Sequence, residues 1–257
     1  MMKYVRFQRE GRSGFGVLEQ ENRIRVATGE MFDRPQLIES TLPLERVRLL
    51  PPCNPGAMIA LWNNSKVQIA KFRRETPEEV LYFLKPSSCF IAHGDSILYP
   101  KTETKRVVLE GEIGIVIGRI CKMVTAQQAK DFIFGYTVVN DVTAQDVVKR
   151  DPTFPQYSRA KGYDTFGSFG PCIDTEVDPL TLRIESFING KRCQDYPVTD
   201  LVFNPYEIVA DISRTMTLRP GDVITCGTSL GADPIVPGDA VEIRIDGIGS
   251  LINHVVE

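Results

Sequence analysis

Histidine, a residue that often takes part in catalysis and metal binding, is scarce in this sequence. The 257 residues contain only two, His93 and His254. A zinc site with two histidine ligands at the usual spacing is therefore excluded, and a Ser–His–Asp triad would depend on one of these two residues. His93 lies in a turn-like segment and His254 lies near the C-terminus. We expect both at the surface and look elsewhere for the chemistry.

Paired cysteines are also absent. The six cysteines are scattered singly, none belongs to a Cys-x-x-Cys motif, and three of them lie in apolar or strand-like segments. Scattered buried thiols in a chain without a visible signal sequence are typical of a reducing compartment. The sequence therefore predicts reduced cysteines and a cytoplasmic location.

The chain also lacks long apolar segments and an excess of positive charge. A membrane-spanning helix needs about 18 or more consecutive apolar residues, and no such run occurs. The 30 Lys and Arg residues are outnumbered by 33 Asp and Glu, which gives a net charge of −3. Nucleic acids and anionic membranes are bound by basic faces. We expect neither a nucleic acid nor a membrane as a partner.

What is present is the composition of a globular protein with two parts. Residues 1–52 alternate in the manner of short strands and end at two consecutive prolines, which favour an extended linker. From Gly56 onward the chain becomes more apolar. We predict a small N-terminal β-rich domain at 1–52 and a main domain at 53–257.

Strand signals dominate both parts, and helices are few and short. Because strands and helices do not alternate as in a Rossmann or barrel fold, the sequence predicts an α+β, mostly β architecture. Capping residues place three helices, with Thr125, Thr143 and Asn204 at or near their starts, and a helical pattern places another at 65–74. Helices are expected over 65–74, 125–132, 143–149 and 205–216. Strands are expected over 4–7, 15–18, 23–27, 107–108, 113–117, 134–140, 182–188, 223–226 and 240–245.

Two glutamates flank a glycine in the apolar segment 107–118. Residues two apart in a strand point to the same face, so Glu110 and Glu112 project together and Gly111 leaves the opposite face bare. Neighbouring carboxylates in an apolar strand repel unless a cation lies between them. Oxygen ligands of this kind suit Mg²⁺, Mn²⁺ or Ca²⁺. The alternative is an edge strand on which both glutamates are solvated.

A third carboxylate, Asp141, follows the strand predicted at 134–140. Carboxylates at strand ends commonly bind metals. Three carboxylates from two neighbouring strands would hold one cation and leave positions open for water and substrate. The alternative is that Asp141 is a turn or cap residue.

Two further segments carry functional signals, each with a simple alternative. Lys161 lies in a segment rich in glycine and aromatic residues, where an ammonium group can stabilise a developing enolate or carboxylate charge. The alternative is a solvated surface lysine. The segment 226–231 follows a strand, and its small residues would let backbone N–H groups approach a carboxylate. The alternative is an ordinary turn.

Four motifs, taken in order, resemble those of the fumarylacetoacetate hydrolase family. They are Glu-x-Glu at 110–112, Gly-Tyr-x-x-x-Asn-Asp at 135–141, Lys-x-x-Asp-Thr-Phe at 161–166, and Pro-Gly-Asp-x-Ile-x-x-Gly-Thr at 220–228. Phe-Leu-Lys-Pro at 83–86 and Val-Pro-Gly-Asp at 236–239 also fit. The similarity covers residues 56–257, which is the whole predicted main domain.

The resemblance implies a fold, a cofactor and a set of site residues. The fold would be a mixed β-sandwich or β-roll domain of the family's C-terminal type, usually dimeric. Mg²⁺ or Mn²⁺, with Ca²⁺ possible, would bind Glu110, Glu112 and Asp141, and a small 2-oxo acid substrate would chelate it. Lys161 would be catalytic, near the substrate oxyanion. The substrate-binding residues would be Thr165, Gly227 and Thr228.

The chain departs from the family in the lid segment 61–69. Hydrolytic members carry a histidine and a glutamate there that together activate water, whereas Lys66 and Ile69 stand at those positions here. An arginine that often follows the metal-binding aspartate is replaced by Gln145. Both departures argue against hydrolysis of a C–C bond.

Enol chemistry survives these losses, because a cation can act as a Lewis acid on a 2-oxo carboxylate. Lys66, if the lid desolvates it, could be the acid–base group, or it could simply attract an anionic substrate. We predict an isomerase or tautomerase that acts through a metal-bound enolate and resembles 2-hydroxyhepta-2,4-diene-1,7-dioate isomerase. The alternatives are an oxaloacetate-type decarboxylase, an acylpyruvate- or fumarylacetoacetate-type hydrolase, and a metal-retaining protein that only binds its ligand.

Overall fold

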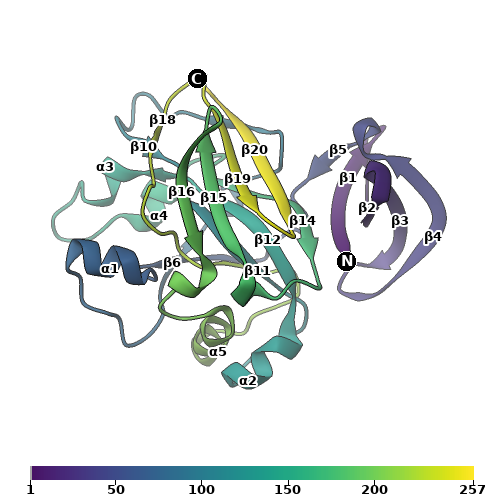
Figure 1. Cartoon of the computed structure of the whole chain (residues 1–257), viewed down its shortest axis with the longest axis horizontal. Helices are drawn as coiled ribbons and strands as arrows, with labels where there is room; N and C mark the ends of the chain where they lie inside the picture. The colour runs from purple at the N-terminus through teal and green to yellow at the C-terminus, as the bar shows by residue number, and fades with distance from the viewer. Residues whose placement is uncertain (1) are drawn as a thin grey trace.

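The computed structural model describes residues 2–257, apart from the side chain of residue 21 (Figure 1). The fold is α+β and mostly β, as predicted. The α-helices are α1 (Lys66–Phe72), α2 (Ala126–Ala129), α3 (Gln145–Val148), α4 (Tyr157–Lys161) and α5 (Pro205–Thr215). The 3-10 helices are η1 (Gln20–Asn22), η2 (Leu44–Arg46), η3 (Ser87–Cys89), η4 (Lys130–Phe132), η5 (Pro179–Thr181) and η6 (Val198–Asp200). The strands are β1 (Lys3–Arg9), β2 (Arg12–Glu19), β3 (Arg23–Glu30), β4 (Asp33–Pro43), β5 (Arg48–Leu50), β6 (Met58–Trp62), β7 (Leu81–Lys85), β8 (Phe90–Ile91), β9 (Ser96–Leu98), β10 (Val107–Val108), β11 (Gly111–Ile117), β12 (Ile133–Asp141), β13 (Thr143–Ala144), β14 (Gly167–Asp174), β15 (Arg183–Ile188), β16 (Lys191–Pro197), β17 (Val223–Thr225), β18 (Pro234–Ile235), β19 (Ala240–Ile245) and β20 (Gly249–Val256).

The N-terminal strands β1 to β5 stand to one side of the molecule, at the right of Figure 1. They remain hydrogen-bonded to the rest, because β1 pairs with β14 and the large sheet runs in the order β4-β3-β2-β1-β14-β12-β11-β17-β6-β7. The strands predicted at 4–7, 15–18 and 23–27 are present in this unit. Strand β4 was not predicted, because it contains Pro35 and its side chains are mostly exposed and polar.

A second sheet, in the order β16-β15-β19-β20-β9, lies against the large one. Figure 1 shows its yellow and green strands in front of β11 and β12. Contacts between the sheets join β11 to β15, β12 to β19, and β14 to β20. This packing makes β11 and β12 central elements of the main domain. The finer prediction of a sandwich or roll stays a prediction.

Strand β11 is buried along its whole length. Its side chains alternate between two apolar clusters: Ile113 and Ile115 belong to the larger one, and Val116 belongs to the smaller. Burying each such side chain contributes about 1.5–3 kcal/mol. A one-residue slip would exchange the two faces, so the apolar side chains fix the direction in which Glu112 projects.

The helices mostly begin where the capping signals placed them. Ser65 caps α1 by accepting a hydrogen bond from the Gln68 amide, and capping boxes open α2 at Thr125 and α5 at Asn204. The predicted cap at Thr143 is wrong. Residues 143–144 form β13, which pairs with β10, and the Thr143 hydroxyl donates to the Asp141 carbonyl at 3.0 Å. Strand pairing therefore overrides the local capping signal.

Other sequence features can be placed directly. All six cysteines are free thiols, and five of them are buried. His254 is exposed, and His93 is half-buried with its Nδ1 accepting from the Ile252 amide at 3.2 Å. Among the described residues, no helix is both long enough and apolar enough to span a bilayer.

Candidate metal centre and active site

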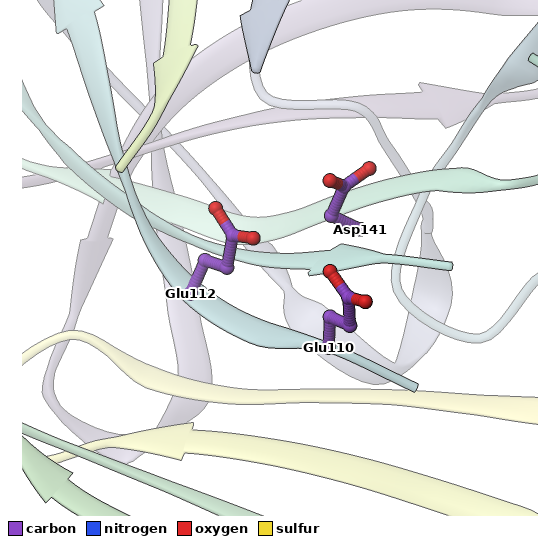
Figure 2. Close-up of side chains that lie close together, drawn as sticks. All are labelled: Glu110, Glu112 and Asp141. Atoms are coloured by element: carbon purple, nitrogen blue, oxygen red, sulfur yellow. The ribbon is translucent and has the colours of Figure 1, made fainter. Parts of the chain in front are cut away.

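Three carboxylates converge where β11 and β12 run side by side (Figure 2). Glu112 lies on β11, Asp141 ends β12, and Glu110 directly precedes β11 rather than lying within it. One oxygen of each carboxylate lies within 4.8 Å of the other two. The Asp141 amide donates to the Glu110 carbonyl at 2.9 Å, which holds the strand ends in register. The structure thus brings the three predicted ligands together.

Gly111 lets the second sheet approach the glutamate strand. A Cβ atom at this position would lie 2.2 Å from Ser186 Oγ and 2.9 Å from Ile243 Cγ2, both on the second sheet. Any larger residue would therefore push the two sheets apart. The face opposite the glutamates, predicted to be bare, is filled by this packing.

The carboxylates lie in the interior. Glu112 is 1% exposed and Asp141 is fully buried, while the Glu110 side chain is 16% exposed. Strand β11 lies between β12 and β17 in the sheet. The alternative of an edge strand with solvated glutamates is therefore wrong.

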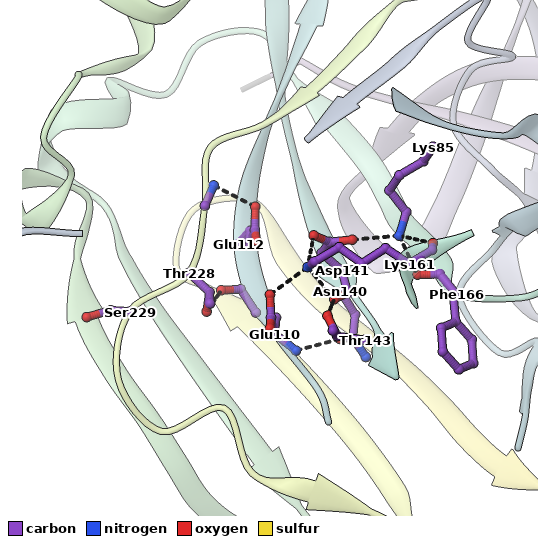
Figure 3. Close-up of polar contacts among 12 residues, drawn as sticks. Lys85, Glu110, Glu112, Asn140, Asp141, Thr143, Lys161, Phe166, Thr228 and Ser229 are labelled. Carbon is purple, nitrogen blue, oxygen red and sulfur yellow. Dashed lines mark hydrogen bonds and ion pairs between the residues drawn. The ribbon is translucent and has the colours of Figure 1, made fainter. Parts of the chain in front are cut away.

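Two lysines meet the carboxylates (Figure 3). The Lys161 ammonium donates to Glu110 Oε2 at 2.7 Å and to Asp141 Oδ2. The Lys85 ammonium donates to Asp141 Oδ1 at 2.6 Å. The Lys161 side chain is only 6% exposed, so the alternative of a solvated surface lysine is wrong.

Burial and these charges set the pKa values of the cluster. Burial raises the pKa of Glu110, and it raises that of Glu112, together with the charge of Asp141, to about 8. Burial also opposes ionisation of Asp141, but the Lys161 and Lys85 ammonium groups outweigh it and lower the pKa of that carboxyl. Burial disfavours the charged form of Lys161, yet the surrounding carboxylates raise its pKa. The cluster therefore favours an ionised Asp141, a charged Lys161 and a protonated Glu112.

The donor set fits a hard divalent cation. All three candidate ligands offer oxygen, which Mg²⁺ and Mn²⁺ prefer. Glu112 Oε2 accepts from the Gly227 amide at 2.7 Å, but Glu112 Oε1 is buried and has no hydrogen-bond partner within the described chain. An orphaned carboxylate oxygen in the interior is costly. A divalent metal bound by the three carboxylates would satisfy it.

A cavity of about 430 Å³ opens onto this cluster. Glu110 and Lys161 line it together with Trp62, Arg74 and Tyr157. The Arg74 guanidinium lies 5.3 Å from the centroid of the Trp62 ring. The cavity lining therefore combines one acidic residue, Glu110, with aromatic and cationic side chains.

The loop after β17 forms another wall of the cavity. Gly227 has a φ of +88°, which favours glycine, and its amide is used by Glu112. The Thr228 hydroxyl donates to the Gly111 carbonyl at 3.1 Å and accepts from Gln194 Nε2 at 2.9 Å. Within residues 2–257 the amides of Thr228 and Ser229 make no hydrogen bond. These two amides, unlike that of Gly227, have no partner within the described residues.

Two predicted site residues lie apart from the cluster. Lys66 is exposed, and its ammonium donates to the Thr199 carbonyl at 2.9 Å. The Thr165 hydroxyl oxygen accepts from the Leu98 amide at 2.8 Å. Neither residue lines the cavity. The structure thus groups Glu110, Glu112, Asp141, Lys161, Gly227 and Thr228, and it leaves Lys66 and Thr165 outside.

Sequence reasoning assigned no role to two residues that support the site. Lys85 belongs to the Phe-Leu-Lys-Pro motif at 83–86, and that motif was its only available signal. Gln194 lies on β16, far from the site in sequence, yet its side-chain oxygen accepts from the Gly111 amide at 2.9 Å while its nitrogen holds Thr228. No local pattern could have identified Gln194, because its partners come from two other segments.

The pKa of Glu112 predicts how cation binding depends on pH. Below about 8 this carboxyl holds a proton, which a cation must displace, so the apparent affinity for Mn²⁺ should rise by up to about tenfold per pH unit until pH 8. Calorimetry in buffers of different ionisation enthalpy would report the released proton. Affinity that is independent of pH between 6 and 8 would contradict this prediction.

The raised pKa of Glu112 also predicts how the stability of the cation-free protein depends on pH. The folded-state pKa of Glu112 is raised from its ordinary value of 4.5 to about 8. Its contribution to stability is complete below the unfolded-state pKa and is lost as the pH rises through the folded-state pKa. The Glu112→Gln variant has no proton to lose at this position. In chelator, the urea midpoint of the variant minus that of the unaltered chain should therefore increase as the pH rises.

Comparisons with known proteins show which sequences and structures this chain resembles. The sequence model described as fumarylacetoacetate (FAA) hydrolase, C-terminal, matches residues 57–256, and one described as Rv2993c-like, N-terminal, matches residues 2–52. The crystal structure of 2-hydroxyhepta-2,4-diene-1,7-dioate isomerase from Mycobacterium marinum is 37% identical, with a TM-score of 0.91 over 100% of this chain and 98% of the other.

Two further relatives differ in their named reactions. Maleylpyruvate hydrolase from Sphingobium sp. SYK-6, solved with manganese and pyruvate, is 27% identical, with a TM-score of 0.80 over 99% of both chains. The 4-hydroxyphenylacetate degradation bifunctional isomerase/decarboxylase of Salmonella dublin is 30% identical over 93% of this chain and 56% of its own length. Isomerases, hydrolases and decarboxylases therefore all occur among proteins similar to this chain.

Proposed function

The chain belongs to the fumarylacetoacetate hydrolase family, and from this premise we propose that it is an isomerase or tautomerase of small 2-oxo or 2-hydroxy-dienoic dicarboxylates that depends on Mg²⁺ or Mn²⁺. The observation that carries the proposal is the buried carboxylate triad, one member of which, Glu110, lines a cavity, with one Glu112 oxygen unpartnered within residues 2–257. A 2-hydroxyhepta-2,4-diene-1,7-dioate isomerase is the nearest type.

Each group of site residues has a separate role in the proposed reaction. Glu110, Glu112 and Asp141 would hold the cation, which supplies Lewis-acid polarisation of a 2-oxo acid when bound. The Lys161 ammonium borders the cavity and stabilises negative charge on the enolate oxygen. The free amides of Thr228 and Ser229 bind the substrate carboxylate.

Proton transfer by Lys66 is not part of the proposal. Its ammonium is exposed and bound to the Thr199 carbonyl, outside the cavity. The histidine and glutamate that activate water in hydrolytic members are absent from α1, where Lys66 and Ile69 stand. Isomerisation is therefore favoured over hydrolysis.

Decarboxylation is the second candidate reaction. Loss of CO₂ from a 2-oxo dicarboxylate leaves an enolate, which the same Lys161 charge would stabilise, and it needs no water-activating base. The similarity to a bifunctional isomerase/decarboxylase supports this candidate. The non-enzymatic alternative is a protein that binds the cation and a 2-oxo acid without turnover.

One assay separates these readings. Oxaloacetate is followed for enol–keto conversion and for CO₂ release, with Mn²⁺ and with chelator. Faster enol–keto conversion without CO₂ release is the expected result, and chelator should abolish it. Release of CO₂ would select the decarboxylase, and binding of oxaloacetate without either reaction would select the non-enzymatic alternative.

Replacing Lys161 tests its assigned role. The Lys161→Met variant should lower turnover by about 10²–10³-fold, the usual loss when a donor to a developing oxyanion is removed. Mn²⁺ affinity should be retained or tightened, because a positive charge beside Glu110 and Asp141 is gone. Turnover and calorimetry on the same preparation measure both. Unchanged turnover would remove Lys161 from the mechanism.

We also propose a homodimer in the cytoplasm, with a small 2-oxo acid as the only other partner, as the family resemblance implies. Light scattering of the purified chain at several concentrations tests the dimer.

A further inference from the structure

We propose that Lys85 is a positioning residue of the cation site: it fixes the direction of the Asp141 carboxylate and anchors the segment that carries Lys161. This inference rests on the proposed function only in assuming that the triad binds a divalent cation. Lys85 ends strand β7 on the far side of Asp141 from the glutamates (Figure 3).

The Lys85 ammonium has all its donors committed. The side chain has no exposed surface, and the ammonium donates to Asp141 Oδ1 at 2.6 Å, to the Lys161 carbonyl at 2.6 Å and to the Phe166 carbonyl at 3.2 Å. An ammonium carries three donors. With three acceptors from fixed positions, this group cannot rotate freely.

Lys85 and Lys161 use different oxygens of Asp141. Lys85 binds Oδ1, whereas Oδ2 faces Lys161 and, beyond it, Glu110. Pinning Oδ1 in the interior fixes the plane of the carboxylate. Oδ2 is thereby directed into the cluster, where it can serve as a cation ligand without Lys85 competing for it.

The two carbonyl contacts connect a second part of the site. The Lys161 carbonyl ends helix α4 and the Phe166 carbonyl directly precedes strand β14. One ammonium therefore ties together β7, the end of β12 and the segment 161–166. Partners behind metal ligands typically govern metal affinity by about 10–100-fold, and sites need support of this kind to hold their geometry.

If Lys85 acted through its charge alone, removing it would tighten cation binding rather than weaken it. Lys85 is a buried positive charge beside a ligand, and its removal without any loss of orientation would tighten cation binding, since like charges repel. At a pH where Asp141 stays ionised, weaker binding after its removal comes from a disordered Asp141 or a displaced segment. The sign of the change therefore distinguishes positioning from charge balance.

The test measures Mn²⁺ binding to Lys85→Met by calorimetry, with electron paramagnetic resonance of free Mn²⁺ as a second readout. We expect the Kd to rise by about tenfold or more. Lys3→Met is the matched control, because the Lys3 ammonium also donates to a carbonyl, that of Ile248 at 2.9 Å, but touches no carboxylate of the triad. Its Kd should match that of the unaltered chain.

Three outcomes would overturn the proposal. An unchanged or lower Kd for folded Lys85→Met reduces Lys85 to a structural or charge-balancing role. If Lys85→Met does not fold, Lys85→Gln is measured in its place, because its shorter side chain carries two donors and cannot hold all three acceptors. A Kd equal to or below that of the unaltered chain then has the same meaning. If the unaltered chain binds no Mn²⁺, both this proposal and the proposed function fail. If the unaltered chain binds Mn²⁺ and the variant binds it equally well, only the role of Lys85 fails.

Discussion

Glu112→Gln is expected to abolish binding of the divalent cation while leaving the cation-free fold intact. A glutamine resembles the protonated glutamate that the pKa of about 8 implies at neutral pH, and its oxygen can still accept from the Gly227 amide. It lacks the negative charge that makes a carboxylate a strong ligand for a hard cation. Without Lewis-acid assistance of several kcal/mol, turnover should fall by about 10³-fold or more.

The measurement is thermal unfolding with and without Mn²⁺. For the unaltered chain, a concentration of about 100 Kd should add about 2.7 kcal/mol to stability, whereas the variant should show no shift. Glu185→Gln is the matched control, because Glu185 lies on β15, pairs with Arg192 and is not a predicted ligand, so its Mn²⁺-dependent shift should equal that of the unaltered chain. A Mn²⁺-dependent shift that persists in Glu112→Gln would show that the cation binds elsewhere.

The sequence allowed prediction of the site to the extent that its signals were local. Glu110 and Glu112 are separated by one glycine, and Asp141 ends a clearly apolar strand, so their convergence followed from strand geometry. The predicted face was right although Glu110 lies just outside β11. Lys161 is different, because only the family resemblance connected it with residues 20 positions earlier.

Contacts between distant segments could not be predicted. Lys66 stands at the position of a catalytic histidine, yet it begins α1 and turns toward Thr199, since nothing in the sequence shows where a helix faces. Gly227 was expected to bind a substrate carboxylate, but its amide is used by Glu112. The pairing partner of a backbone amide depends on tertiary structure, which a local motif does not contain.

In the fold, too, the elements with local sequence signals were predicted and those that depend on distant segments were not. Helices α2 and α5 begin at the predicted caps because the capping box uses residues three apart. The equivalent signal at Thr143 failed because β10 offers a strand partner 35 residues earlier in the chain, through Val108. Strand β4 was missed because an exposed strand lacks apolar alternation.

Asp141→Asn is expected to produce the largest loss of stability. Asp141 is the carboxylate that Lys85 and Lys161 share, and all three side chains are almost or fully buried. Asparagine keeps the shape and one acceptor oxygen but removes the charge. Leaving buried ammonium groups without their counter-ion typically costs about 3–5 kcal/mol, measured here as the urea unfolding free energy in chelator at neutral pH.

Asp195→Asn is the matched control, because Asp195 also pairs with two cations, Arg183 and Arg192, but at the surface, where those side chains are 54% and 53% exposed. Water replaces the lost carboxylate there, so little change is expected. A second signature is the pH dependence. The pKa of Asp141 is lowered from its ordinary value of 3.8, so its contribution is present above that value and is lost as the pH falls through the folded-state pKa. The gap between the unaltered chain and Asp141→Asn should therefore close in acid, and a gap that is small at neutral pH would mean that the buried lysines find water instead.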